Sequence, residues 1–183
     1  MVLLETPFCE FGKKFKQFNL SSTDEKNLSS VDLYGKNGTL IMFICNHCPY
    51  VKAIIKEIVA TANILKKYNI NSLAIMSNDV KKYPEDNFEN MKIFSKKHSF
   101  TFPYLFDYKQ SVAKNYDAKC TPDFFGFNKF NELQYRGRIS ELKNLKPVAD
   151  SKNELLEAML LILKTNKGPI KQFPSMGCSI KWK

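Results

Sequence analysis

Two cysteines three positions apart, Cys45 and Cys48, are the residues of this chain best suited to chemistry. An apolar run, Leu40 to Ile44, precedes them, and Pro49 follows at the start of a stretch with helical periodicity. This order predicts a strand, a dithiol and a helix. Cysteines at this spacing at a helix start can approach closely enough to form a disulfide. The pattern therefore favours thiol–disulfide exchange.

The helix start predicts that the two thiols differ. The first turn of a helix carries unpaired N–H groups and the positive end of the macrodipole, so a thiol there ionises more easily. We expect Cys45 to be the outer sulfur and the nucleophile. Cys48, one turn further in and less exposed, is expected to attack the mixed disulfide and release the product. A protonated His47 would stabilise the thiolate form and make the disulfide more oxidising.

A metal site is the main alternative use of the dithiol. The cysteines and the histidine elsewhere in the chain are Cys9, Cys120, Cys178 and His98. They contain no second CxxC and no histidine pair, whereas structural zinc needs four ligands. We therefore expect no metal and no organic cofactor. A metal-binding or copper-chaperone role, with Cys45, Cys48 and a nearby histidine as ligands, stays open as a function of a different class.

The segments before and after the dithiol predict a βαβ unit. Residues 1–38 contain short apolar pieces and turn residues, which indicates an N-terminal β-hairpin or an extended lead-in. After the dithiol, apolar residues recur at helical spacing to about Tyr68. Ile70 to Met76 then reads as a buried strand. A strand, a helix of this length and a second apolar strand predict that the two strands are parallel.

The second half of the chain predicts further alternating elements. A helix opens at Pro84 and runs to about His98, followed by a short strand and a short helix, and this section resembles an insertion. Phe124–Phe127 and Leu133–Arg136 are predicted to form a hairpin. A helix is predicted from Ser151 to Thr165, with Ser151 and Glu154 as a capping box at its start. The tail, residues 166–183, is predicted to be irregular.

Length and composition limit the class of protein. The 183 residues fit a single domain, and 44% hydrophobic residues is ordinary for a globular protein. The net charge is +10, but the lysines are scattered, so no nucleic-acid partner is expected. Glu5 interrupts the first apolar residues and no apolar run is long enough for a bilayer, so we expect no secretory signal, no membrane partner and a cytoplasmic location. Reducing conditions there favour a catalytic dithiol over a structural disulfide.

Several motifs together resemble one family. The segments are ICNHCPYVK around the dithiol, YPEDNFENM, CTPDFFGF and the terminal GCSIKWK. They resemble the redoxin (AhpC/TSA-type) branch of the thioredoxin superfamily. The resemblance implies an α/β, thioredoxin-like fold: a central mixed β-sheet flanked by helices, with an N-terminal β-hairpin extension and an insertion before the cis-proline strand. It also implies that Cys45 attacks, that Cys48 resolves, and that Pro122 is a cis-proline whose neighbour Thr121 offers backbone hydrogen bonds to a bound peptide or thiol.

The chain also departs from the patterns of related families. Ile44 stands where a thioredoxin commonly has Trp, and residues 39–44 supply no carboxylate to act as a buried proton relay. A peroxiredoxin commonly has Thr three residues before its reactive cysteine. In this chain the residue three before Cys45 is Met42, and the residue three before Cys48 is Cys45, so neither cysteine has that Thr. Both departures weaken the expectation of general reductase or direct peroxidase activity.

Cys120 and Cys178 are possible secondary thiols. Cys120 is two residues before Pro122, so a cis-proline would bring it near the active-site face. Cys178 lies in the tail, which could fold over the site. We interpret both as structural or bystander thiols, because buried unreactive cysteine is common.

The sequence thus predicts a thiol–disulfide oxidoreductase that acts on a protein or small-molecule disulfide and is recycled by a thiol reductant. The alternative enzyme is a thiol peroxidase, an antioxidant in which a hydroperoxide oxidises Cys45 to a sulfenic acid that Cys48 resolves.

Overall fold

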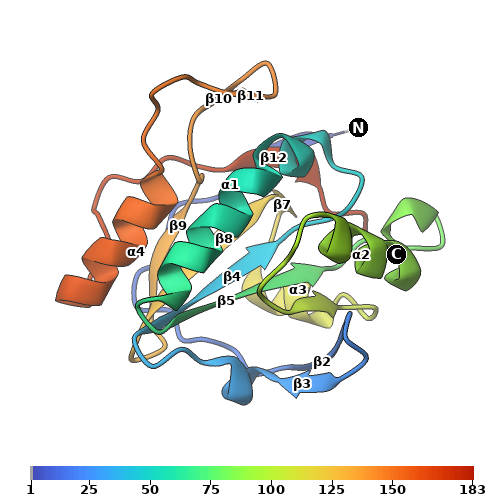
Figure 1. Ribbon diagram of the computed structural model, residues 1–183, viewed down its shortest axis with the longest axis horizontal. Coiled ribbons are helices and arrows are strands. Elements are labelled where there is room, and N and C mark those ends of the chain that lie inside the picture. Colours follow the sequence, from blue (N-terminus) through green and yellow to red (C-terminus); the bar gives the residue numbers. More distant parts are fainter. Residues whose placement is uncertain (1) are drawn as a thin grey trace.

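A seven-stranded mixed sheet forms the centre of the computed structural model, which describes residues 2–183 (Figure 1). Its strands, in spatial order, are β3 (Asn27–Ser29), β2 (Asn19–Ser22), β6 (Tyr104–Phe106), β5 (Ile70–Met76), β4 (Gly38–Phe43), β8 (Asp123–Asn128) and β9 (Leu133–Gly137). The central strand β4 is parallel to β5 and antiparallel to β8, and β5 is parallel to β6. The predicted βαβ unit and mixed sheet are confirmed.

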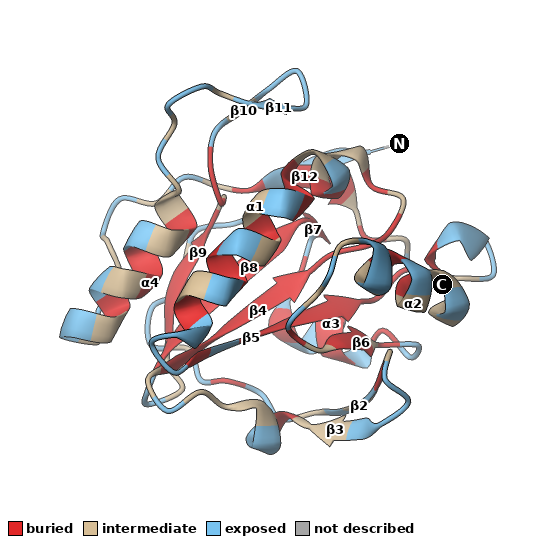
Figure 2. Cartoon of the chain, in the orientation of Figure 1, coloured by how far each residue is buried: buried red, intermediate tan, exposed pale blue. Residues whose placement is uncertain are grey.

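Helices cover both faces of this sheet. They are α1 (Pro49–Lys66), α2 (Phe88–Lys97), α3 (Ser111–Tyr116) and α4 (Glu154–Thr165), with 3-10 turns at Ser30–Leu33 and Pro84–Asp86. Every β4 residue is buried, so its side chains serve two cores in alternation. Leu40 and Met42 pack with α1, α2 and α4, whereas Ile41 and Phe43 pack with α3. In Figure 2 the central strands β4, β5, β8 and β9 are red almost throughout, the edge strands β2 and β3 are mostly tan or pale blue, and the long helices carry buried residues on one side only.

The N-terminal and middle segments join this sheet. Residues 19–29 form the antiparallel β2–β3 hairpin, which confirms the predicted N-terminal hairpin. The predicted insertion contributes β6, which pairs with both β5 and β2. Among the described residues, 2–183, no helix has both the length and the apolar composition needed to span a bilayer.

The prediction of an irregular tail over residues 166–183 is wrong in its last part. Strand β12 (Met176–Ser179) pairs antiparallel with both β1 (Leu3–Glu5) and β7 (Cys120–Thr121), which makes a second, three-stranded sheet. The partners of β12 are distant in sequence, so no local pattern revealed the strand. A small hairpin of β10 (Leu142–Lys143) and β11 (Lys146–Pro147) completes the structure.

The predicted capping box of the last helix is also wrong. Helix α4 begins at Glu154, and Asn153 is its N-cap, with its side-chain oxygen accepting a hydrogen bond from the Leu156 N–H. Ser151 therefore lies outside the capping position. Asn is as good a cap as Ser, so the helix keeps the stabilisation that a cap supplies.

A buried ion pair fixes the strand that follows Pro122. Arg136 on β9 donates to both carboxylate oxygens of Asp123 on β8, at 2.9 and 3.3 Å, and to the Asp117 carbonyl at 2.8 Å. The side chains of the pair are 1% and 0% exposed, and the guanidinium lies 4.5 Å from the Phe125 ring centre. Burial raises the pKa of Asp123 despite the neighbouring guanidinium. Removal of either partner would leave the other charge buried and unpaired.

We expect Asp123→Asn to lower the free energy of unfolding by about 3 kcal/mol, the typical cost of breaking a buried pair. Urea unfolding followed by circular dichroism measures it. Asp117→Asn is the matched control, because the Asp117 side chain pairs with Lys119 at the surface and should change stability little. Equal effects of the two substitutions would contradict this account of the pair.

Candidate active site

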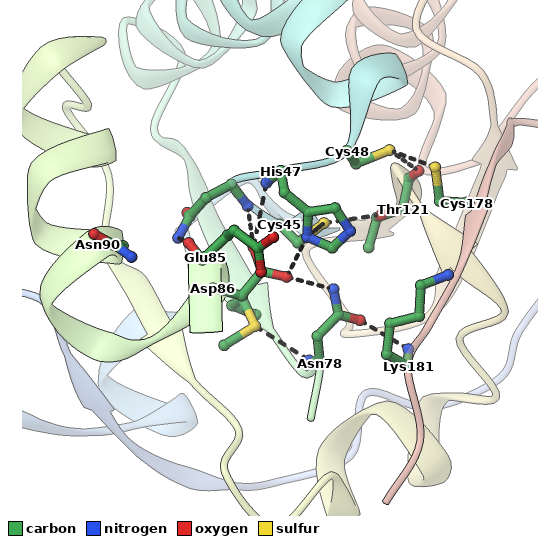
Figure 3. Close-up of polar contacts among 12 residues, drawn as sticks. Cys45, His47, Cys48, Asn78, Glu85, Asp86, Asn90, Thr121, Cys178 and Lys181 are labelled. Carbon is green, nitrogen blue, oxygen red and sulfur yellow. Dashed lines mark hydrogen bonds and ion pairs between the residues drawn. The ribbon is translucent and has the colours of Figure 1, made fainter. Parts of the chain in front are cut away.

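The dithiol lies where three segments meet: the start of α1, the Thr121–Pro122 bond and strand β12 (Figure 3). The Thr121–Pro122 peptide bond is cis, as predicted. Cys45 and Cys48 are both 0% exposed. The prediction that Cys45 is the outer sulfur is therefore wrong, because β7, β12 and the 3-10 turn at Pro84–Asp86 enclose both thiols.

Cys48 is the sulfur at the N-terminus of α1. It is the N-cap residue, and its side chain makes no capping hydrogen bond. Its thiol donates a hydrogen bond to the Thr121 carbonyl oxygen at 3.1 Å, and its sulfur lies 3.2 Å from the Cys178 sulfur. Hydrogen bonding with the Cys45 thiol lowers the pKa of Cys48 to about 5 despite burial. Of the three neighbouring thiols Cys45, Cys48 and Cys178, Cys48 is the one whose pKa is lowered.

The pKa of Cys45 is shifted in the opposite direction to that of Cys48. Burial, the hydrogen bond that it donates to Cys48 and the nearby Asp86 carboxylate raise the pKa of Cys45 well above its ordinary value. Its sulfur lies 3.4 Å from the Thr121 hydroxyl and 3.9 Å from Nδ1 of His47. The pKa shifts of Cys45 and Cys48 therefore run in the opposite order to the one expected from the sequence.

His47 is held by a buried carboxylate. Its Nδ1 lies 2.6 Å from Oδ2 of Asp86, and its ring stacks on Tyr83 at 5.7 Å between ring centres. The hydrogen bond to Asp86 raises the pKa of His47. Burial alone would raise the pKa of Asp86, but hydrogen bonds from His47 and Asn78 hold it below its ordinary value. The pair therefore favours an imidazolium beside a carboxylate.

Asp86 is the functional residue that the sequence analysis missed. Its side chain is completely buried, and it accepts hydrogen bonds from the backbone N–H groups of Asn46 and His47 and from the Asn78 amide. The sequence analysis placed this residue only within the helix that it predicted to open at Pro84. The available signal was topological: loops that follow the carboxyl ends of adjacent parallel strands meet at one edge of a sheet.

The other cysteines differ in how they relate to the dithiol. Cys178 is paired in register with Thr121 and points toward Cys48, so the expectation that it is a bystander does not fit its position. The sulfur of Cys120 lies 3.6 Å from the Pro122 carbonyl oxygen, and burial raises its pKa far above the ordinary value. Cys9 packs against the core on the other face of the sheet.

A metal could be held by one set of side chains among the described residues, 2–183. The ligand atoms of Cys45, His47 and Asp86 lie within 4.8 Å of one another. This set has Asp86 where the sequence analysis expected Cys48. A metal there would have to displace the hydrogen bond between His47 and Asp86, because both Asp86 oxygens already accept hydrogen bonds.

Comparison with solved structures shows close relatives across the whole chain. An uncharacterized conserved protein from Geobacillus kaustophilus is 39% identical, with a TM-score of 0.95 over 100% of this chain and 97% of that one. A hypothetical protein from Sinorhizobium meliloti 1021 is 30% identical, with a TM-score of 0.90 over 98% of each chain. A thiol:disulfide interchange protein of the thioredoxin family from Chlorobium tepidum TLS shares the fold at 14% identity, with a TM-score of 0.64 over 83% of this chain and 97% of that one.

No curated protein matched the sequence. The model of the AhpC/TSA family matches residues 11–138, which include the dithiol, the cis-proline and all seven strands of the central sheet. The fold is thioredoxin-like, and the family supports oxidoreductase chemistry at thiols in general. The chain belongs to the AhpC/TSA family.

Proposed function

We propose that the protein is a thiol–disulfide oxidoreductase in which Cys48 attacks and Cys45 resolves. The observation that carries this proposal is the Cys48 sulfur at the start of α1, with its lowered pKa and a protonated cysteine hydrogen-bonded to it. A thiolate is the attacking species in disulfide exchange. This assignment exchanges the two roles expected from the sequence.

The reaction proceeds in two exchanges. The Cys48 thiolate attacks one sulfur of a substrate disulfide, which forms a mixed disulfide and releases the other sulfur as a thiolate that takes up a proton. Cys45 then loses its proton and attacks the Cys48 sulfur, which closes the Cys45–Cys48 disulfide and releases the second substrate thiol. The substrate is reduced by two electrons and the dithiol is oxidised. An external thiol reductant returns the protein to the dithiol form.

His47 is proposed to be a positioning and electrostatic residue in the second exchange. Its Nδ1 is 3.9 Å from the Cys45 sulfur, and its hydrogen bond to Asp86 favours the imidazolium form. A positive charge at this distance stabilises the thiolate that Cys45 must form before it attacks. Asp86 keeps the charge on the ring, although its own negative charge opposes ionisation of Cys45.

The substrate is proposed to approach beside the cis-proline. A cavity of about 190 Å³ opens there, and its lining includes Tyr50, Pro122, Ile139 and Met176. Its largely apolar walls suit the apolar side chains around a substrate disulfide. Because neither cysteine is exposed, the exchange requires a local movement that uncovers the Cys48 sulfur.

Peroxide reduction is the second candidate function. It is favoured by a low-pKa thiolate with a second thiol close enough to resolve a sulfenic acid. The two arginines of the chain are engaged elsewhere: Arg136 pairs with Asp123, and Arg138 pairs with Glu154. Neither guanidinium is therefore free to stabilise the charge that develops on a departing peroxide oxygen.

We expect the reduced protein to react with hydrogen peroxide within about tenfold of the rate of free cysteine at equal thiolate concentration. The physical reason is that no arginine assists the leaving oxygen. Stopped-flow fluorescence or competition kinetics measures this rate. A rate many orders of magnitude above that of free cysteine would make peroxide the substrate and would displace the primary proposal.

We expect Cys48→Ser to slow exchange with oxidised glutathione by roughly 100-fold or more, because the substitution removes the only thiol with a lowered pKa. Release of reduced glutathione follows the reaction. Cys45→Ser should retain the first exchange, and Cys120→Ser, which alters a buried thiol of raised pKa, should react like the parent protein. Retention of the first exchange in Cys48→Ser, with loss in Cys45→Ser, would show that the roles are those expected from the sequence.

We expect Asp86→Asn to lower the pKa of His47 below 6.5, because the substitution removes the stabilising carboxylate while burial continues to disfavour the charged ring. The raised pKa of His47 in the parent adds stability at pH values below 6.5, and this contribution disappears as the pH rises through the raised value. Proton NMR titration of the ring resolves both effects. His98, the other histidine, has its pKa lowered by burial and serves as the internal control. An unchanged His47 titration would contradict the proposed role of Asp86.

A further inference from the structure

The third thiol of the site, Cys178, reaches Cys48 from the opposite end of the sequence. Strand β12 pairs with β7, which puts Cys178 opposite Thr121. Gly177 permits this close approach, because a Cβ at its position would lie 2.0 Å from the Thr121 carbonyl oxygen. The pairing of β12 with β1 on its other side holds the strand in place. The position of Cys178 is therefore built into the second sheet.

Cys48 has two sulfur neighbours. The Cys45 thiol donates a hydrogen bond to it from within the CxxC segment. The Cys178 sulfur lies 3.2 Å away, across a sequence separation of 130 residues. A disulfide bond is about 2.05 Å long, so a movement of roughly 1 Å would bring Cys48 and Cys178 to bonding distance. Figure 3 shows the two sulfurs facing each other beside the Thr121 carbonyl.

Cys178 differs from an ordinary packed cysteine in its contact with another sulfur. Its residue is 1% exposed, yet its sulfur contacts another sulfur instead of an apolar side chain alone. Burial and the hydrogen bond with Cys48 raise the pKa of Cys178 to about 12, and the positive charge of Lys181 opposes this rise only in part. Cys120 is equally buried, but its sulfur contacts the Pro122 carbonyl oxygen.

We propose that Cys178 is a second resolving thiol, which exchanges with Cys45 as the disulfide partner of Cys48. The inference rests on the proposed oxidoreductase function. In the exchange, the Cys178 thiolate attacks the Cys48 sulfur of the Cys45–Cys48 disulfide. A Cys48–Cys178 bond forms, the Cys45–Cys48 bond breaks, and Cys45 leaves as a thiolate that takes the proton lost by Cys178. The protein as a whole is neither oxidised nor reduced in this step.

The exchange would give the oxidised protein two forms with different structural consequences. The Cys45–Cys48 disulfide closes a loop within one short segment, whereas the Cys48–Cys178 disulfide joins the start of α1 to β12. In the second form Cys45 is again a free thiol beside His47. The same Cys178 thiolate can also attack a mixed disulfide on Cys48 directly, which releases the substrate thiol without using Cys45.

Peptide mapping after oxidation tests the proposal directly. Trypsin places Cys45 and Cys48 in one peptide, residues 37–52, and Cys178 in another, residues 172–181. The protein is equilibrated in glutathione buffers, quenched in acid, alkylated, and mapped by mass spectrometry. We expect a fraction of the parent protein to contain the two peptides joined. In Cys45→Ser the joined fraction should rise several-fold, and in Cys48→Ser and Cys178→Ser it should disappear.

Two controls make the outcome specific. Cys9→Ser and Cys120→Ser should leave the joined fraction unchanged, since neither sulfur is proposed to take part. If Cys45→Ser yields no joined peptides, or if Cys48→Ser retains them, the proposal is wrong. A reversible disulfide within residues 37–52 without any joined peptides would overturn this inference alone. The absence of both disulfides in the parent protein would overturn the proposed function as well.

Discussion

The site depends on burying a thiol, Cys48, whose pKa is lowered. A charged group buried without partners is strongly disfavoured, so Cys48 needs hydrogen-bond donors from its surroundings. The start of α1 supplies the positive end of the helix macrodipole. The Cys45 thiol supplies a hydrogen bond, and the Cys178 sulfur lies 3.2 Å away. Each donor belongs to a segment that other parts of the fold must bring into position.

The central sheet fixes the positions of two of these segments, the start of α1 and the cis-proline segment. Strand β4 is buried on both faces and ends immediately before the dithiol, so its position fixes where α1 begins. Its antiparallel neighbour β8 follows the cis bond, and the buried pair of Asp123 with Arg136 anchors that strand to β9. The small sheet of β1, β12 and β7 then closes over the thiols. The stable core thus positions a site whose own groups are costly to bury.

A second layer of polar groups connects the dithiol to the C-terminal segment. Asp86 binds the backbone beside Cys45 and accepts from His47 and Asn78. Asn78 in turn accepts from the Lys181 N–H, three residues beyond Cys178. The same amide therefore links the carboxylate behind the histidine to the strand that carries the third thiol. This short network therefore connects His47, whose charge depends on pH, to the C-terminal segment that carries Cys178.

The sequence alone determined the elements with strong local patterns. The apolar run of β4, the helical spacing of α1 and the apolar β5 predicted a βαβ unit, and the CxxC was placed at the helix start, where the structure has it. The Thr-Pro pair located the cis-proline through the family resemblance. These features are readable because each depends on residues that are near one another in the chain.

Only the tertiary structure decided the chemistry of each thiol. Ionisation depends on which donors and charges surround a sulfur, and those of Cys45 and Cys48 include Asp86, Thr121 and Cys178, which are all distant in sequence. The sequence therefore located both cysteines at the start of α1, but it did not show that both sulfurs are buried or that their pKa shifts run opposite to the expected order. Strand β12 was missed for the same reason, since its pairing partners lie at the other end of the chain and in the cis-proline segment.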